Sequence, residues 1–270
     1  MLKYNHIIEL RTALKEELES YMGKDHIKLS VDDKLLKRIL IENKKFAIDF
    51  ELVKKLDLTG FKFFNIDISG LDFTGSKGVR INPQKILNKD MHLCKLNSVT
   101  IKGSLDDVLI IGTDFTGSNG ARINPEKVAF KNMSCAKLND AKIISDVKNV
   151  YIAGTDFSGC IGGAKIYVDE VIDKDLRYTI FNGCNLYGTF RWAKVENTNF
   201  SHSKGAVLDA QRLYGRSLNG TKLTDAELLG SLTGVDIRNT IFYGCKDRKI
   251  YKSTCETKEL IKIIKEDFKK

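Results

Sequence analysis

The chain has 270 residues, of which 42% are hydrophobic and 29% are charged, and its formal net charge is +9. This composition is typical of a folded globular protein and excludes an intrinsically disordered one. No run of about 18 apolar residues occurs, so no membrane-spanning helix is predicted. The N-terminus lacks the apolar core and cleavage site of a secretory signal, and we therefore expect a cytoplasmic protein.

The N-terminal region, 1–56, shows helical spacing of apolar residues, once between Ile7 and Leu18 and again between Leu35 and Phe46. Gly23 lies at a break between the two segments. We predict a helical N-terminal region over 1–56 that caps an open strand edge. A partner-binding N-terminal bundle is the alternative.

A long repeat begins after this region. The motif around Phe73 recurs at Phe115, Phe157, Phe200 and Phe242, at intervals of 42, 42, 43 and 42. Within each interval apolar residues recur mostly every fifth position, and all 32 such positions from Phe73 to Ile237 are apolar. The period fits neither a helix nor an ordinary strand. It predicts a square coil, in which each five-residue side turns one large side chain inward.

A smaller residue stands two positions before many of these centres, as at Cys94, Ala136 and Ala141. We expect it to lie near the axis, where four walls converge. One step per repeat is longer than the others, and it contains the segments "TGSKG" and "TGSNG". A phosphate-binding loop would need a helix after its glycines. Here apolar ladder positions such as Ile81 and Ile123 follow, so a surface bulge that replaces one corner is predicted.

The chain closes with a predicted capping helix over 251–270, whose apolar side consists of Leu260, Ile261, Ile263, Ile264 and Phe268. Ser253 and Glu256 have the spacing of a capping box. A dimer contact through this helix is the alternative to a simple cap.

The five-residue units, among them "LDLTG", "LDFTG", "AKLND" and "CNLYG", resemble the pentapeptide-repeat family over about residues 58–250. The resemblance implies an all-β solenoid over 57–250: a right-handed quadrilateral β-helix of about nine coils, with short α-helical segments at both termini. At about 4.8 Å per coil the rod would be roughly 40 Å long. It also implies that Asp72, Asp114 and Asp156 form hydrogen bonds at corners.

No catalytic, metal or cofactor site is predicted. The six cysteines contain no CxxC pair and no histidine at ligand spacing, so we expect buried or semi-buried free thiols. The four histidines form no motif. We therefore predict a non-enzymatic scaffold that binds an unidentified protein, with no cofactor, no small-molecule substrate, no membrane span and no nucleic acid.

The alternative function implied by the family is DNA mimicry, with binding to or protection of DNA gyrase or topoisomerase and resistance to quinolones. Mimicry needs an acidic rod. Residues 57–245 instead contain 23 Lys and Arg against 20 Asp and Glu, which favours the scaffold.

Two candidate surfaces emerge from the repeat. The first is a basic stripe that recurs once per repeat: Lys89, Lys131, Lys174 and Arg216. Its alternative is a ladder salt-bridged to Asp90, Asp175 and other acids, or simply solvated. The second consists of the bulge loops, with these candidate contact residues: Ser76, Lys77, Arg80, Ser118, Asn119, Arg122, Lys165 and Lys204.

Overall fold

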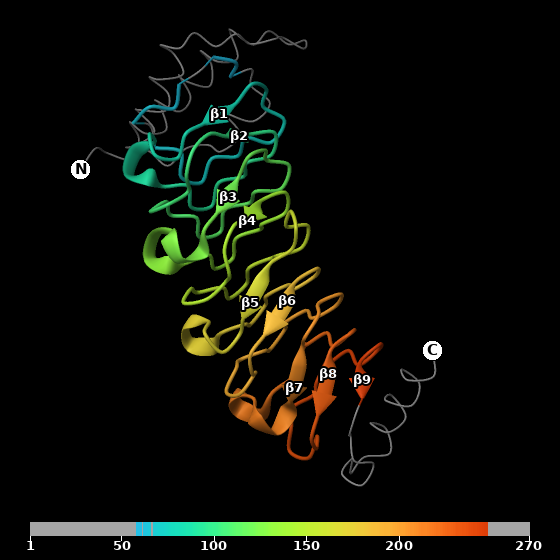
Figure 1. Cartoon of the computed structure of the whole chain (residues 1–270). Helices are drawn as coiled ribbons and strands as arrows, with labels where there is room; N and C mark the ends of the chain where they lie inside the picture. The colour runs from blue at the N-terminus through green and yellow to red at the C-terminus, as the bar shows by residue number, and fades with distance from the viewer. Residues whose placement is uncertain (1–57, 61, 66, 248–270) are drawn as a thin grey trace, which may run out of the picture.

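The computed structural model describes residues 58–60, 62–65 and 67–247, which form an elongated solenoid of stacked coils (Figure 1). Its strands are short and pair in parallel. They are β1 (Arg80–Ile81), β2 (Thr100–Ile101), β3 (Arg122–Ile123), β4 (Lys142–Ile143), β5 (Lys165–Tyr167), β6 (Asn185–Tyr187), β7 (Val207–Asp209), β8 (Glu227–Leu229) and β9 (Lys246–Asp247). The pairs are β1–β2, β3–β4 and β5–β6, followed by the triplet β7–β8–β9.

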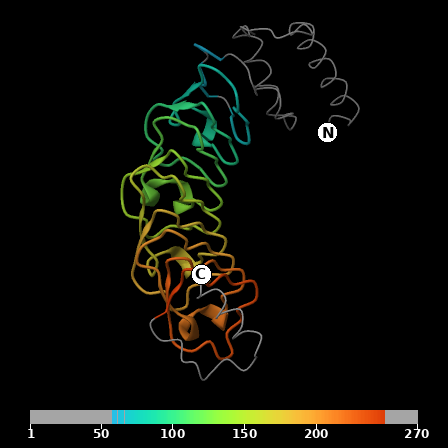
Figure 2. The same cartoon turned by 90° about the vertical axis from the view of Figure 1, so that its right-hand side faces the viewer.

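Single turns of 3₁₀ helix interrupt the coils, and the described residues contain no α-helix. These turns are η2 (Leu87–Lys89), η3 (Pro125–Lys127), η4 (Ala129–Lys131), η5 (Ile172–Lys174), η6 (Ala210–Arg212) and η7 (Tyr214–Arg216). The view in Figure 2 shows the same stacking of coils along the rod from a second direction.

Each repeat contains two coils of unequal length. Along one side, bridges join Asp72 to Lys95, Lys95 to Asp114 and Asp114 to Lys137. The first and third of these steps along the chain are longer than the second, and long and short coils continue to alternate toward the C-terminal end. Bridges also occur on further sides, as at Asp90 with Leu109, and the buried centres between them, such as Ile86 and Leu105, follow the spacing that the square coil predicts.

The ladder of apolar centres forms the core. Of the 32 centres predicted from the sequence, 31 are buried and Ile237 is partly buried against them. The smaller residues two positions earlier are buried as well, including Cys94, Ala136 and Ala141. The prediction of one inward side chain per side is therefore confirmed.

Aromatic side chains stack on one another in the C-terminal half of the core. The ring of Phe181 lies between those of Phe157 and Phe200, with centroid distances of 6.1 and 5.5 Å. All three side chains are almost fully buried. Burial of such a side chain contributes roughly 1.5–3 kcal/mol, and the stacking adds about 0.5–1.5 kcal/mol per pair.

The repeated aspartates shape the corners, as the resemblance implied. The carboxylate of Asp72 accepts a hydrogen bond from the backbone N–H of Thr74 at 2.9 Å, and Asp114 accepts one from Thr116 at 3.0 Å. Asp156 does the same for Ser158 at 2.8 Å. A side chain that accepts from the backbone two residues on replaces a main-chain hydrogen bond in a tight turn.

The glycine-rich segments are bulges, and strands follow them. Gly120 has φ +81, and a methyl group there would lie 2.8 Å from the carbonyl oxygen of Ile101 in the preceding coil. Gly163 has φ +71, and a methyl group there would likewise lie 2.8 Å from the carbonyl oxygen of Gly183. Both the left-handed backbone and the close approach require glycine. The glycines therefore serve the stacking of coils.

Several predictions concern residues outside the described ranges. The helices expected over 1–56 and 251–270 lie there, and the count of about nine coils includes sides beyond residue 247. The domain boundaries and the right-handed winding also stay predictions. One expectation about cysteines was wrong. Cys94, Cys160, Cys184 and Cys245 are buried, but Cys135 is exposed because it occupies a corner that points outward.

Candidate functional site: a basic strand face and a hollow at its end

The nine strands share one side of the solenoid, along which they follow one another in Figure 1. We call this side the strand face; it comprises the outward residues of β1–β9, the residue after each strand and the bulges. Its exposed cations are Lys77, Arg80, Lys102, Arg122, Lys142, Lys165, Lys204 and Lys246. They occupy this side because inward and outward residues alternate along each strand.

Carboxylates are rare on the strand face of the described solenoid. Asp209 forms an ion pair with Arg212 at 3.1 Å, and Glu227 is partly buried. Within the described ranges none of the eight cations forms an ion pair. Neighbouring coils are about 4.8 Å apart, so these charges reinforce one another along the rod. The result is a positive field that favours an anionic partner.

Apolar side chains interrupt the cations. Ile161, Ile144 and Val207 are 54%, 45% and 40% exposed. The rings of Tyr167 and Tyr187 stack on each other with centroids 5.2 Å apart. Exposed aliphatic groups beside charges are typical of a protein-binding surface, because they gain from burial against a partner.

The side of the coil that contains Asp72 is electrically balanced. Lys95 donates to Asp72 at 3.1 Å, and Lys137 donates to Asp114 at the same distance. Burial acts to raise the pKa of Asp72, but hydrogen bonds from Thr74 and Lys95 outweigh it, and the pKa lies below its usual value. The pKa of Asp114 is lowered in the same way. This side therefore offers no excess charge of either sign.

The candidate contact residues of the bulges divide into three groups. Lys77, Asn119 and Lys204 are exposed where they were expected. Arg80, Arg122 and Lys165 are exposed too, but they belong to β1, β3 and β5 and not to loops. Because the bulges sit beside the strands, both groups meet on the strand face.

The third group, Ser76 and Ser118, does not lie on the surface. Their relative exposures are 2% and 7%. Each stands three positions after an inward phenylalanine, at the place where the next small core residue would come. The prediction that they contact a partner is therefore corrected.

The stripe predicted at Lys89, Lys131, Lys174 and Arg216 lies at sharp turns. All four residues have positive φ, between 46 and 50. Lys89 is 3.8 Å from the carboxylate of Asp107, and Lys174 donates to the carbonyl of Arg191 at 3.2 Å.

Two of the partners suggested for a salt-bridged ladder, Asp90 and Asp175, do not contact the stripe, whereas Lys89 pairs with another nearby acid, Asp107. Asp90 contacts His92 at 2.7 Å, and Asp175 contacts Arg177 at 2.6 Å. Because each carboxylate binds the residue two positions later, at its own corner, neither reaches the stripe. Apart from the contact of Lys89 with Asp107, the stripe residues form no ion pair within the described ranges, and they are spaced two coils apart.

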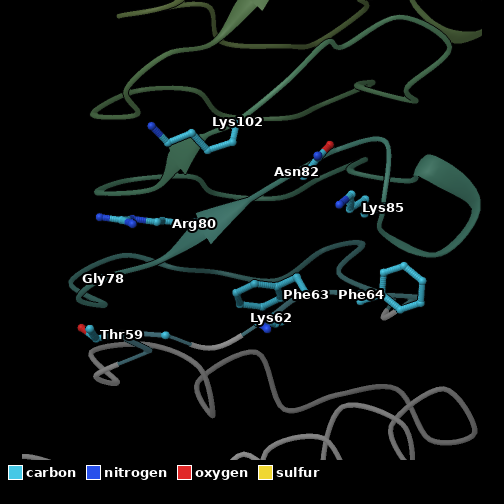
Figure 3. A pocket seen from close by; sticks show the side chains of 10 residues that line it. Thr59, Lys62, Phe63, Phe64, Gly78, Arg80, Asn82, Lys85 and Lys102 are labelled. Carbon is cyan, nitrogen blue, oxygen red and sulfur yellow. The ribbon is translucent and has the colours of Figure 1, made fainter.

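The strand face ends in a hollow near the N-terminal end of the described solenoid, shown in Figure 3. Its volume is about 630 Å³, a size that suits a small molecule. Residues of three consecutive coils line it: 59–60 and 62–64 in the first, Gly78, Arg80, Asn82 and Lys85 in the second, and Lys102 in the third. Arg80 and Lys102 belong to both the hollow and the strand face.

Among the described residues, four basic side chains and no carboxylate line the hollow: Lys62, Arg80, Lys85 and Lys102. Phe63 forms its buried wall and packs edge-to-face on Phe73 at 5.6 Å. Phe64 is 68% exposed. The carboxamide oxygen of Asn82 accepts from the backbone of Gln84 at 3.0 Å, so its amide nitrogen is available as a further donor. The charged groups of the hollow are therefore hydrogen-bond donors.

Sequence reasoning missed five of the basic residues: Lys62, Lys85, Lys102, Lys142 and Lys246. A signal for Lys142 was present: it precedes an inward residue on the same side as Arg80, Arg122 and Lys165. Sorting the outward residues by side of the coil, and not only by repeat, would have grouped Lys142 with Arg80, Arg122 and Lys165. The hollow had no such signal because it depends on how the first coils stack.

No cluster of three or more potential metal ligands occurs within residues 58–60, 62–65 and 67–247. In the same part of the chain, no helix has the length and hydropathy needed to cross a membrane. His92 and His202 each face one aspartate, at 2.7 and 3.4 Å.

The inward side chain on each five-residue side defines a solenoid built from five-residue units, and a pentapeptide-repeat protein is among the solved structures to which this chain is similar. HetL from the cyanobacterium Nostoc sp. strain PCC 7120, involved in heterocyst differentiation regulation, is 12% identical; the match covers 82% of this chain and 95% of HetL, with a TM-score of 0.25.

Two trypsin-treated variants of QnrB1, a plasmid-mediated fluoroquinolone resistance protein, are 14% and 13% identical. They cover 83% and 81% of this chain and 94% and 91% of their own, with TM-scores of 0.17 and 0.21. No family model and no curated protein sequence matches the chain.

Proposed function

We propose that this protein is a non-enzymatic scaffold that binds an acidic partner protein through the strand face. The observation that carries the proposal is the concentration on one side of eight exposed cations, none of which forms an ion pair within the described residues. A rigid rod holds these charges at fixed spacing, so a partner of complementary charge binds without the chain having to reorganise.

The composition of the strand face favours a protein over a nucleic acid. Tyr167 and Tyr187 stack on each other, so the ring faces between them are not available to bases. Exposed Ile144 and Ile161 suit an apolar contact. We therefore expect a partner surface that combines carboxylates with aliphatic groups.

DNA mimicry is the less supported alternative. It requires rows of uncompensated carboxylates along a face. Asp72 and Asp114 are instead paired with Lys95 and Lys137, and Asp236 is paired with Arg238 at 2.8 Å. A gyrase supercoiling assay, with and without a fluoroquinolone, tests this function; we expect no effect of the protein.

The test of the scaffold compares two surfaces with equal charge reversal. One variant has Lys142→Glu, Lys165→Glu and Lys204→Glu on the strand face. The matched control has Lys131→Glu, Lys174→Glu and Arg216→Glu on the stripe. Each is used with wild type as bait, and captured proteins are identified and quantified by mass spectrometry. We expect a set of acidic proteins that the strand-face variant loses by about tenfold or more and the control retains.

Retention of all captured proteins by the strand-face variant would overturn the proposal. Loss of captured proteins by the stripe variant alone would assign partner binding to the stripe instead, that is, to Lys89, Lys131, Lys174 and Arg216. Salt-sensitive binding of wild type to fluorescent single-stranded DNA, abolished by the strand-face substitutions, would replace the acidic protein with a nucleic acid. Circular dichroism of each variant establishes that the fold is unchanged.

A further inference from the structure

We propose that the hollow at the N-terminal end of the strand face binds a small polyphosphate ligand that carries a planar ring, the chemical class of nucleotides. The bulge glycine Gly78 lies in the lining, but the bulges do not form a phosphate-binding loop, because strands and not helices follow them. The proposal rests on the side chains that meet in the hollow from three coils.

The first argument is charge. Lys62, Arg80, Lys85 and Lys102 line one hollow, and none forms an ion pair within the described residues. Like charges held together repel one another, and a polyanion turns this repulsion into attraction. A ligand with a single negative charge would leave most of the repulsion among these side chains uncompensated. We therefore expect a ligand with several negative charges.

The second argument is geometry. Arg80 and Lys102 extend in the same direction from neighbouring coils, while Lys85 and Asn82 lie on the other side of the hollow (Figure 3). A guanidinium binds two phosphate oxygens in a fork, whereas a lysine acts as a point charge. Donors on both sides suit a chain of phosphates that spans the hollow.

The third argument is the pair of phenylalanines. Phe63 is fixed by its edge-to-face contact with Phe73, whereas the neighbouring Phe64 leaves 68% of its surface exposed. An exposed aromatic ring beside cations gains free energy when a planar ring covers it. The hollow of about 630 Å³ can hold such a ring together with its phosphates.

The experiment measures binding of metal-free ATP, inorganic tripolyphosphate and adenosine to the full-length chain by isothermal titration calorimetry. We expect ATP to bind, tripolyphosphate to bind more weakly by about fivefold to tenfold, and adenosine not to bind. Phe64→Ala is expected to reduce the affinity for ATP to that for tripolyphosphate. Equal affinities of ATP and tripolyphosphate for wild type would overturn the role of the ring.

Paired variants separate this site from the proposed scaffold. Lys62→Glu with Lys85→Glu changes the hollow alone and is expected to weaken ATP binding by about a hundredfold, while protein capture persists. Lys142→Glu with Lys165→Glu changes the strand face away from the hollow. This pair is expected to reduce protein capture and to leave ATP binding unchanged. Absence of ATP binding at millimolar concentration, or equal loss in both variants, would overturn the site.

Discussion

Single residues decide how closely two coils of this rod approach. The glycines of the bulges combine a left-handed backbone with a neighbour that leaves no room for a side chain. The two requirements can be compared at Gly162 and Gly163. Their φ values are +82 and +71, but only Gly163 has an obstacle, the carbonyl oxygen of Gly183.

We expect Gly162→Ala to destabilise the protein by about 1–2 kcal/mol, the cost of a left-handed alanine. Gly163→Ala should cost about 1–3 kcal/mol more, since the coils must also move apart. Urea denaturation followed by circular dichroism measures both. Equal effects of the two substitutions would show that the close approach is unimportant.

Thiol reactivity is a second property that depends on individual positions. Burial raises the pKa of Cys160 to about 12 and that of Cys184 to about 12, and it raises the pKa of Cys94 as well. The reactive species is the thiolate. These thiols should therefore stay unmodified in the folded protein.

We predict that an alkylating reagent at pH 8 modifies Cys135 and spares Cys94, Cys160 and Cys184. Peptide mapping by mass spectrometry distinguishes these sites from one another and from Cys255. Addition of denaturant provides the control, because all sites should then react. Modification of Cys184 at the rate of Cys135 would contradict the buried core.

At the scale of elements, paired charges join successive coils. The pKa values of Asp72 and Asp114 are lowered in the folded chain from the usual value of 3.8. Their contribution to stability is therefore fully present above that value. It is lost as pH falls through their lowered values, because the unfolded state binds protons first.

We predict that Asp72→Asn with Asp114→Asn lowers stability at pH 7 by about 1 kcal/mol or less for each carboxylate. The difference from wild type should shrink as pH falls from 5 to 2. Denaturant midpoints across this range measure it, and Asn199 shows that asparagine suits the same corner. A constant difference at all pH values would exclude the ionised carboxylates as its cause.

Much of the architecture was accessible from the sequence because the core repeats. Thirty-one of the 32 inward positions predicted from the spacing of apolar residues are buried. The outward residues obey no such constraint. Ser76 and Ser118 look like exposed loop residues in the sequence, and only the path of the bulge places them inside.

The candidate site was predictable only in part. Arg80, Arg122 and Lys165 were identified as contact residues, but the reason given was loop position, and the structure places them on strands. The hollow depends on the relative placement of three coils, which residue spacing does not encode. The net charge of residues 57–245 was a misleading guide to the surface, because a balance close to neutral conceals one strongly basic side.

At the scale of the whole molecule, each coil contacts mainly its two neighbours, so stability should be coupled only locally. Phe181 and Phe200 belong to successive coils with rings 5.5 Å apart. Phe115 lies several coils away from Phe200.

We predict that Phe181→Leu and Phe200→Leu together deviate from additivity by about 0.5–3 kcal/mol, whereas Phe115→Leu and Phe200→Leu add to within about 0.5 kcal/mol. A double-mutant cycle from chemical denaturation measures both pairs. Leucine is used because Leu223 already occupies the ladder position equivalent to Phe181 in the next repeat. Strong coupling of the distant pair would show that the rod behaves as one indivisible unit.

The alternation of long and short coils also governs how this molecule can change its length. Bulges occur on every second coil. Removing one whole repeat deletes one coil of each kind and leaves every remaining bulge beside the same type of neighbour. Removing a single short coil would bring two bulges together on the strand face and break its line of charges. Insertions and deletions that preserve the rod should therefore come in pairs of coils, so genetic duplication would lengthen the basic surface in fixed increments of two coils.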